Sequence, residues 1–218
     1  NEIGFIEKKK ERILFLNRKR ISVLTDLPQA VITHNKNLSI IILAVKPSDI
    51  NNVLNDLKKP VKKHIAIVSI LAGINLKKLS SLLPAKQPIA RVMPNTPAMI
   101  GKGMSVITYN KNLSKKQRTL IEKIFKAVGK TIILEEKYFD LITALSGSGP
   151  AYFCYLTECL ISCTKKLGLN EKIASTLALQ TALGTICLLL KENLTPEGLR
   201  ALVTSPKGTT EAALQVLQ

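Results

Sequence analysis

The sequence contains no tryptophan, and aromatic residues make up only 4% of its 218 residues. A protein that binds single-stranded nucleic acid by stacking bases needs exposed aromatic rings, so this shortage argues against such a platform. Acidic residues are also scarce relative to basic ones, and the formal net charge is +17. Clustered cations would fit a polyanionic partner. Lysines spread in short pairs, such as Lys58-Lys59 and Lys115-Lys116, are more typical of compositional drift, so we expect no nucleic-acid partner.

No CxxC pair and no Cys/His cluster is present, so no metal site is predicted. The four cysteines, at positions 154 to 187, lie in apolar sequence of helical character. The spacing of Cys159 and Cys163 places both thiols on one helical face, where we expect core residues rather than a disulfide. The uninterrupted apolar strand run Ile40–Val45 is too short to span a membrane. Because no signal peptide is seen at the start, we expect a cytoplasmic protein without a membrane partner.

Short apolar runs alternate with polar helical stretches over the first two thirds of the chain. The predicted strands are 3–6, 13–16, 30–33, 40–45, 65–70, 89–93, 104–108 and 131–134, and the predicted helices are 49–57, 76–83 and 114–128. This alternation predicts a doubly wound α/β fold, and hence a Rossmann-type dinucleotide-binding domain over residues 1–135.

After Glu135 the strand signals stop, and residues 139–145, 151–167 and 171–192 show helical periodicity, which predicts an all-helical domain over residues 136–218. The stretch Thr176–Leu190 is too apolar for a solvated helix, so we expect a dimer interface or a deep core to bury it.

One expected element of a dinucleotide-binding domain is missing. The first strand should lead into a glycine-rich turn and a helix, yet only Glu7–Arg12 separate it from the second predicted strand. A parallel crossover needs about a dozen residues. Either these two strands are not parallel, or the numbering runs on across a missing segment, which is the interpretation we favour. A chain that has truly lost this loop would be a non-catalytic relative.

Several strand ends carry candidate binding residues, since ligands of open α/β sheets lie beyond the carboxyl ends of the strands. Asn17 and Arg18 follow the second predicted strand, and their amide and guanidinium groups could bind the 2′-phosphate of NADP. A solvated run of charged residues is equally compatible with the spacing. Ala44–Pro47 follows the fourth strand. Ala72 and Gly73 follow the fifth, where small residues allow a flat ring to approach the backbone.

Two polar turns precede predicted helices in the second half of the chain. Ser146–Ala151 opens one helix with glycines and a proline, which fits either an anion site or an ordinary helix-helix turn. Thr204–Thr210 precedes the last helix, and its backbone N–H groups and hydroxyls could hold a small carboxylate, although a plain Ser/Thr-rich N-cap is the commoner explanation.

Taken together and in this order, four motifs resemble the pyrroline-5-carboxylate reductase family: AVKP at 44–47, MPNTPA at 93–98, SGSGPAY at 146–152 and SPKGTTEA at 205–212. The resemblance implies an NAD(P)H-dependent oxidoreductase that reduces 1-pyrroline-5-carboxylate to L-proline, the last step of proline biosynthesis. It also implies that the helical domain forms a homodimer, in the family often assembled further into a decamer of five dimers.

The resemblance also implies roles for individual residues. Thr210 would be catalytic by hydrogen-bonding the imine nitrogen of the substrate. The substrate carboxylate would be held by Ser205, Gly208 and Thr209, and Glu136 would lie near the substrate. NADP, or alternatively NAD, would be contacted by Asn17, Arg18, Asn35, Ala44, Val45, Lys46, Pro47, Ala72 and Gly73.

Two departures from the family pattern matter. The glycine-rich turn is absent after Ile6, and Lys207 stands where the family usually has glycine. Two alternatives therefore stay open. One is a non-catalytic relative that lacks the phosphate-binding loop, and the other is a different small NADP-dependent oxidoreductase, such as a hydroxyacid dehydrogenase with a helical C-terminal domain.

Overall fold

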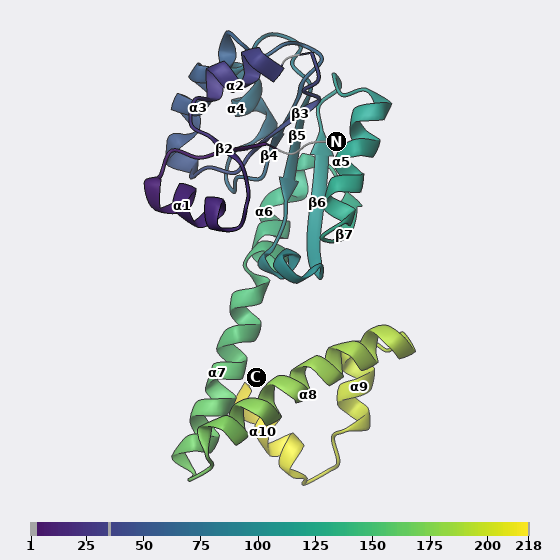
Figure 1. Ribbon diagram of the computed structural model, residues 1–218. Helices are drawn as coiled ribbons and strands as arrows, with labels where there is room; N and C mark the ends of the chain where they lie inside the picture. The colour runs from purple at the N-terminus through teal and green to yellow at the C-terminus, as the bar shows by residue number, and fades with distance from the viewer. Residues whose placement is uncertain (1–3, 35, 218) are drawn as a thin grey trace. The chain divides into compact units, whose positions relative to one another are not determined.

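The computed structural model describes residues 4–34 and 36–217 (Figure 1). The chain forms two compact units, Asn1–Pro150 and Ala151–Gln218. This division falls later in the chain than the predicted domain boundary between residues 135 and 136. That predicted boundary stays a prediction. Each unit is considered by itself below.

The first unit alternates strands and helices as far as β7. Its elements are β1 (Phe5–Ile6), α1 (Lys10–Arg18), β2 (Val23–Leu24), α2 (Leu27–His34), β3 (Ile40–Leu43), η1 (Pro47–Asp49), α3 (Ile50–Lys58), β4 (Ala66–Ser69), α4 (Leu76–Leu82), β5 (Ile89–Met93), η2 (Thr96–Ile100), β6 (Gly103–Tyr109), α5 (Lys115–Lys126), β7 (Gly129–Ile133), η3 (Glu136–Tyr138), α6 (Phe139–Ile142) and the π-helical turn η4 (Thr143–Gly147).

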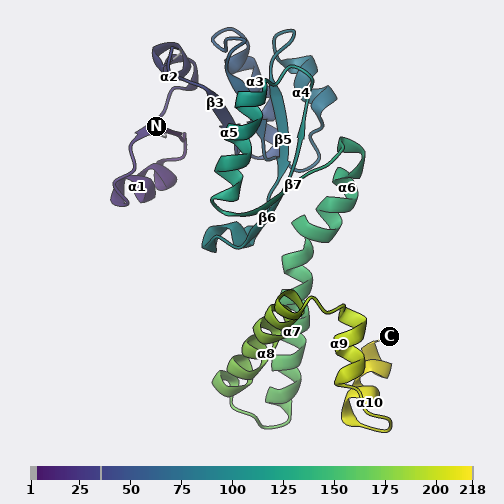
Figure 2. The ribbon, with the colours of Figure 1, turned by 90° about the vertical axis from the view of Figure 1, so that its right-hand side faces the viewer.

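The main sheet has five strands in the order β3-β4-β5-β6-β7. Strands β3, β4 and β5 are parallel, β6 is antiparallel to β5, and β7 is parallel to β6. Because side chains alternate along a strand, Ile67 of β4 packs in a core with α2, α3 and α4, whereas Val68 packs in a second core with α5. Figures 1 and 2 show these helices on opposite faces of the sheet. The predicted doubly wound α/β fold is therefore confirmed.

The strands and helices predicted beyond residue 40 all form close to their predicted positions. Strand β5 has the predicted bounds, and α5 begins after Ser114 as expected. The Ser114 hydroxyl accepts a hydrogen bond from the Gln117 N–H while the Gln117 side chain accepts one from the Ser114 N–H, which satisfies two N–H groups at the helix start.

Two predicted strands are wrong, because residues 13–16 lie in α1 and residues 30–33 lie in α2. In α2 the buried residues Leu27, Ala30 and Val31 have helical spacing, and the Asp26 carboxylate caps the helix by accepting from the Gln29 N–H at 2.9 Å. Both features mark a helix, but the β-branched run Val31–Thr33 obscured them in the sequence.

The correction at α1 also removes the apparent shortage of connecting residues. Strand β1 pairs in parallel with β2 rather than with residues 13–16, so residues 7–22 form the crossover. A parallel crossover returns the chain to the starting edge, usually through a helix, and α1 supplies it. The two-stranded sheet of β1 and β2 is separate from the main sheet.

The second unit contains most of α7 (Gly149–Lys166) together with α8 (Glu171–Glu192), α9 (Pro196–Leu202) and α10 (Thr209–Leu217). All four cysteines are exposed on α7 and α8, so the prediction of Cys159 and Cys163 as core residues is wrong for the single chain. Within the described residues, α8 is the one helix that is long and apolar enough to cross a membrane, by length and composition. Most of its side chains, including Leu177 and Leu183, are nevertheless exposed.

Candidate functional site

The carboxyl ends of three parallel strands bring two predicted cofactor segments together. Leu43, Ser69 and Arg91 stand side by side in β3, β4 and β5, and the Ile70 N–H donates to the Leu43 carbonyl at 3.2 Å. The segments 44–47 and 71–73 therefore leave the sheet next to each other. Gly73 has a φ of 75°, a left-handed conformation that favours glycine. This edge is where an open α/β sheet accepts a ligand.

Residues Ala44–Pro47 are exposed at this edge, with Lys46 extended and Pro47 starting the 3-10 turn η1. Ala72 and Gly73 are also exposed. An accessible backbone with small side chains suits the flat face of a nicotinamide ring, which makes this edge the candidate cofactor site.

Glu136, predicted near the substrate, is held by two donors from the first unit. Its Oε1 accepts from the Leu76 N–H at 2.7 Å and from the Arg91 Nη1 at 3.0 Å. The Arg91 side chain is only 5% exposed, and its guanidinium lies 4.5 Å from the centre of the Phe139 ring. Glu136 thus neutralises a buried cation and ties η3 to the first turn of α4, close to Gly73. The sequence analysis did not foresee this role, although a lone arginine inside an apolar strand was a signal for it.

The MPNTPA segment is fixed to its neighbours by Asn95. The Asn95 Oδ1 accepts from the Met104 N–H at 2.8 Å, and its Nδ2 donates to the Ser146 carbonyl at 3.2 Å. A side chain at Gly147 would clash with the Met93 Cε. Asn95 therefore holds the end of β5 against the π-helical turn, which leads into α7 at Gly149 as predicted. Such turns are frequent at functional sites.

The predicted substrate residues lie in the second unit, at the start of α10. Thr209 is the first residue of the helix, and a side chain at Gly208 would come within 2.5 Å of the Ser205 Oγ. The N–H groups of Thr209 and Thr210 fall in the first helical turn, where helix geometry leaves N–H groups without an intrahelical acceptor. These N–H groups and the two threonine hydroxyls form a small anion cradle.

The backbone of Lys207, just before the cradle, has an unusual conformation. Its φ is 59°, a left-handed conformation that costs a non-glycine residue about 1–2 kcal/mol. Its N–H donates to the Glu211 Oε2 at 2.7 Å and the Gly208 N–H donates to the Ser205 carbonyl, so both N–H groups are already used. The cradle for a carboxylate is therefore narrower than the sequence predicted, with its free donors at Thr209 and Thr210.

Three predicted cofactor residues lie away from the sheet edge or outside the description. Asn17 and Arg18 form the end of helix α1 and not the end of a strand, so the reasoning that placed them beside the adenosine is wrong in its premise. Asn35 lies outside the described residues. Their contacts with a cofactor stay predictions.

Among the described residues, the connection between β1 and α1 is not a glycine-rich turn of the kind that binds the pyrophosphate of a dinucleotide. Glu7, Lys8 and Lys9 join β1 to α1, and the sequence has no glycine between Gly4 and Gly73. The Glu7 Oε1 accepts from the N–H groups of Lys8 and Lys9 at 2.9 and 3.0 Å. The sheet edge at Ala44–Pro47 and Ala72–Gly73 is thus open to a ligand, whereas the turn after β1 lacks the glycines that would let a pyrophosphate approach its backbone.

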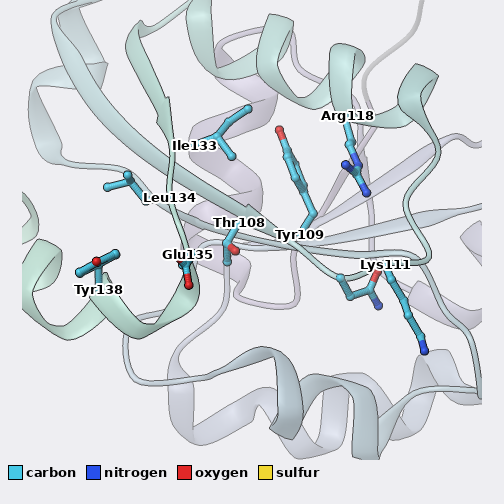
Figure 3. Close-up of a pocket in the computed structure, with 9 residues that line it drawn as sticks. Thr108, Tyr109, Lys111, Arg118, Ile133, Leu134, Glu135 and Tyr138 are labelled. Carbon is cyan, nitrogen blue, oxygen red and sulfur yellow. The ribbon is translucent and has the colours of Figure 1, made fainter.

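A pocket of about 580 Å³ lies elsewhere on the first unit (Figure 3). It is lined by Thr108, Tyr109, Asn110, Lys111, Arg118, Ile133, Leu134, Glu135 and Tyr138. Burial, and next the carboxylate of Glu122, raise the pKa of Tyr109 to about 12. Because Tyr109 ends β6, which is antiparallel to β5, this pocket opens at the other end of the sheet from Ala44. It contains none of the predicted site residues. Among the described residues, no three His, Cys, Asp or Glu side chains are grouped to hold a metal ion.

Comparisons with known proteins agree with the motifs. The family model for pyrroline-5-carboxylate reductase dimerisation matches residues 136–218. Pyrroline-5-carboxylate reductase 1 of Bacillus subtilis is 35% identical, with 96% of this chain and 73% of the relative covered. The Mycobacterium tuberculosis enzyme is 33% identical over 235 residues, covering 97% of this chain and 78% of the relative. Since 235 exceeds the 218 residues of this chain, that relative carries residues within the aligned region that have no counterpart here.

A solved structure supports the same assignment. The Plasmodium falciparum pyrroline carboxylate reductase with NADP bound has a TM-score of 0.88 and 29% identity, covering 98% of this chain and 78% of that one. This chain belongs to the pyrroline-5-carboxylate reductase family.

Proposed function

We propose that this chain reduces 1-pyrroline-5-carboxylate to L-proline with NAD(P)H. The observation that carries the proposal is the 35% identity to a pyrroline-5-carboxylate reductase over 96% of the chain. NADP is the favoured cofactor, with NAD as the alternative, because the Plasmodium falciparum relative holds NADP. A cytoplasmic location fits a metabolic enzyme of this kind.

The residues of the cradle would bind and polarise the substrate. The N–H groups of Thr209 and Thr210, together with the Ser205 hydroxyl, are proposed to hold the carboxylate of the substrate. The Thr210 hydroxyl would accept a hydrogen bond from the protonated ring nitrogen and keep the proton there, which makes the imine carbon electrophilic. Bound NAD(P)H would supply the hydride to that carbon. Most of the rate would come from orientation and from this fixed polarisation.

The segments Ala44–Pro47 and Ala72–Gly73 are proposed as contacts of the nicotinamide half, since they lie together at one sheet edge. Asn17, Arg18 and Asn35 remain proposed contacts of the adenosine half. Glu136 is proposed to act near the substrate by fixing Arg91 and the start of α4 in place.

Replacing Thr210 by alanine tests the proposed catalytic role. The variant should lower kcat roughly tenfold to a thousandfold, the range for one lost polar contact to the transition state. The assay follows the oxidation of NADPH by its absorbance in the presence of pyrroline-5-carboxylate. Thr119→Ala is the matched control, because the Thr119 hydroxyl donates only to the Lys115 carbonyl of its own helix, on α5. Equal rates for the two variants would remove Thr210 from the mechanism.

The helical unit is proposed to form a homodimer, and a decamer of five such dimers is the larger assembly proposed. The dimerisation family model covers α8, and the leucines of that helix are exposed. A large exposed apolar surface in water indicates that another surface covers it. A partner chain of the same kind provides that burial and accounts for the apolar length of α8 without a membrane.

One observation favours a second candidate, a family member without catalytic activity. The connection from β1 to α1 lacks the glycine-rich turn that holds a cofactor pyrophosphate. The same assay separates the two, provided that NADPH is raised above about 1 mM, the upper end of ordinary KM values. Turnover at high NADPH supports the reductase, and its absence supports the non-catalytic relative.

A further inference from the structure

The start of helix α1 is the place where a dinucleotide-binding domain holds the cofactor pyrophosphate. In such domains the first strand passes through a glycine-rich turn, and free N–H groups at the helix start point at the phosphates. Here β1 ends at Ile6, α1 begins at Lys10, and Glu7, Lys8 and Lys9 form the connection. The backbone of Lys9 is extended, with φ −81° and ψ 118°. A side chain at every position of this turn prevents the close approach that glycine allows.

The N–H groups that precede α1 are already occupied by a carboxylate of the protein. The Glu7 Oε1 accepts from the N–H groups of both Lys8 and Lys9, and the Glu7 Oε2 lies 3.9 Å from the Arg12 Nε. A pyrophosphate entering this turn would meet a negative charge on the donors that it needs. It would therefore have to displace Glu7 from two hydrogen bonds and an ion pair.

The surrounding unit also lacks the packing that would hold a rigid phosphate site. Helix α1 buries no residue, and both residues of β1 are exposed. The pair β1 and β2 forms its own two-stranded sheet and does not continue the main one. Binding of phosphates at this turn would thus have to order the segment as well, which weakens affinity.

We infer that this chain does not hold the cofactor phosphates by its backbone, so that NADPH binds little more tightly than its nicotinamide half alone. The inference rests on the proposed function for the nicotinamide edge at Ala44–Pro47 and Ala72–Gly73. Cations beside the turn, such as Lys8 and Arg12, leave only a salt-screened attraction for phosphate. Reduced nicotinamide mononucleotide should therefore bind with an affinity similar to that of the dinucleotide.

Equilibrium titration of the full chain tests the inference without any turnover. The dissociation constants of NADPH and of reduced nicotinamide mononucleotide are measured by nicotinamide fluorescence at near-physiological salt. A ratio within tenfold is expected, whereas NADPH binding more than tenfold tighter would overturn the inference and leave the proposed function standing. If neither compound binds, the phosphates are not held and the inference stands, but the proposed reductase is refuted.

A pair of charge-matched variants tests the part assigned to Glu7. Glu7→Gln removes the charge from the two N–H groups, whereas Glu11→Gln removes the same charge from the first turn of α1, where Glu11 accepts no hydrogen bond from these N–H groups. Glu7→Gln should tighten NADPH binding several-fold more than Glu11→Gln does, with mononucleotide binding unchanged in both. Equal effects of the two variants would show that Glu7 does not block the turn. Far-UV circular dichroism checks that both variants keep their fold.

Discussion

Replacing Glu136 by alanine should lower the free energy of unfolding by about 3 kcal/mol. Removing one partner of a buried ion pair costs about 3–5 kcal/mol, because the other charge is left without compensation. Arg91 is nearly fully buried, but the Glu136 side chain is 30% exposed, so water can reach the gap and the cost falls below this range, to about 2 kcal/mol. The Leu76 N–H also loses its acceptor, which adds about 1 kcal/mol.

Glu136→Gln separates the charge from the hydrogen bonds. An amide oxygen can still accept from Leu76 and Arg91, so this variant should lose only about 1 kcal/mol, the difference between charged and neutral hydrogen bonds. Urea unfolding followed by far-UV circular dichroism measures both changes. Glu135→Ala is the control, since Glu135 pairs with Lys137 on the surface and its side chain is 71% exposed. That control should leave the unfolding midpoint unchanged.

A double-mutant cycle provides the decisive result. In an Arg91→Met background no buried cation remains, so adding Glu136→Ala should cost much less than it does alone. Additive losses in the cycle, or a loss for Glu136→Gln as large as that for Glu136→Ala, would show that Glu136 does not stabilise this unit by neutralising Arg91.

Three further predictions follow from local features. Lys207→Gly should raise stability by about 0.5–1 kcal/mol in thermal unfolding, because relief of the left-handed φ exceeds the added chain entropy, whereas Lys166→Gly at the end of α7 should not stabilise the chain. Tyr109 should remain protonated up to about pH 12, so stability present below pH 10 is lost as the pH rises from 10 to 12; ultraviolet titration against Tyr109→Phe checks this, and ionisation near pH 10 would contradict it. Leu183→Glu should reduce the mass of the particle in light scattering, and an unchanged mass would show that α8 is not the interface.

The sequence predicts the main sheet well because its signals are local and strong. Strand β5 and the cap at Ser114 are encoded by an apolar run and by a Ser/Gln pair at the right spacing. The errors lie before residue 35, where short apolar runs fit both a strand and a helix. Residues 13–16 lie in helix α1, and β1 pairs instead with β2, a partner that no local pattern in the sequence identifies.

Parts of the candidate site were predictable and parts were not. The common edge of Ala44–Pro47 and Ala72–Gly73 follows from parallel strands, since their carboxyl ends must meet. The hydrogen bonds of Glu136 join residues far apart in sequence, so no local pattern encodes them. The left-handed backbone of Lys207 was foreseen only as a departure from glycine, and its bond to Glu211 depends on the folded turn.

The exposed apolar surface of α8 has a consequence for how the protein is made. With the proposed dimer, covering α8 is part of folding, so stability rises with protein concentration and the melting temperature of a dilute sample should fall. A newly synthesised chain would carry a helix of membrane-like composition until it meets a second chain. Dependence on chaperones during that interval, and loss by aggregation when expression is unbalanced, are therefore properties of this helix.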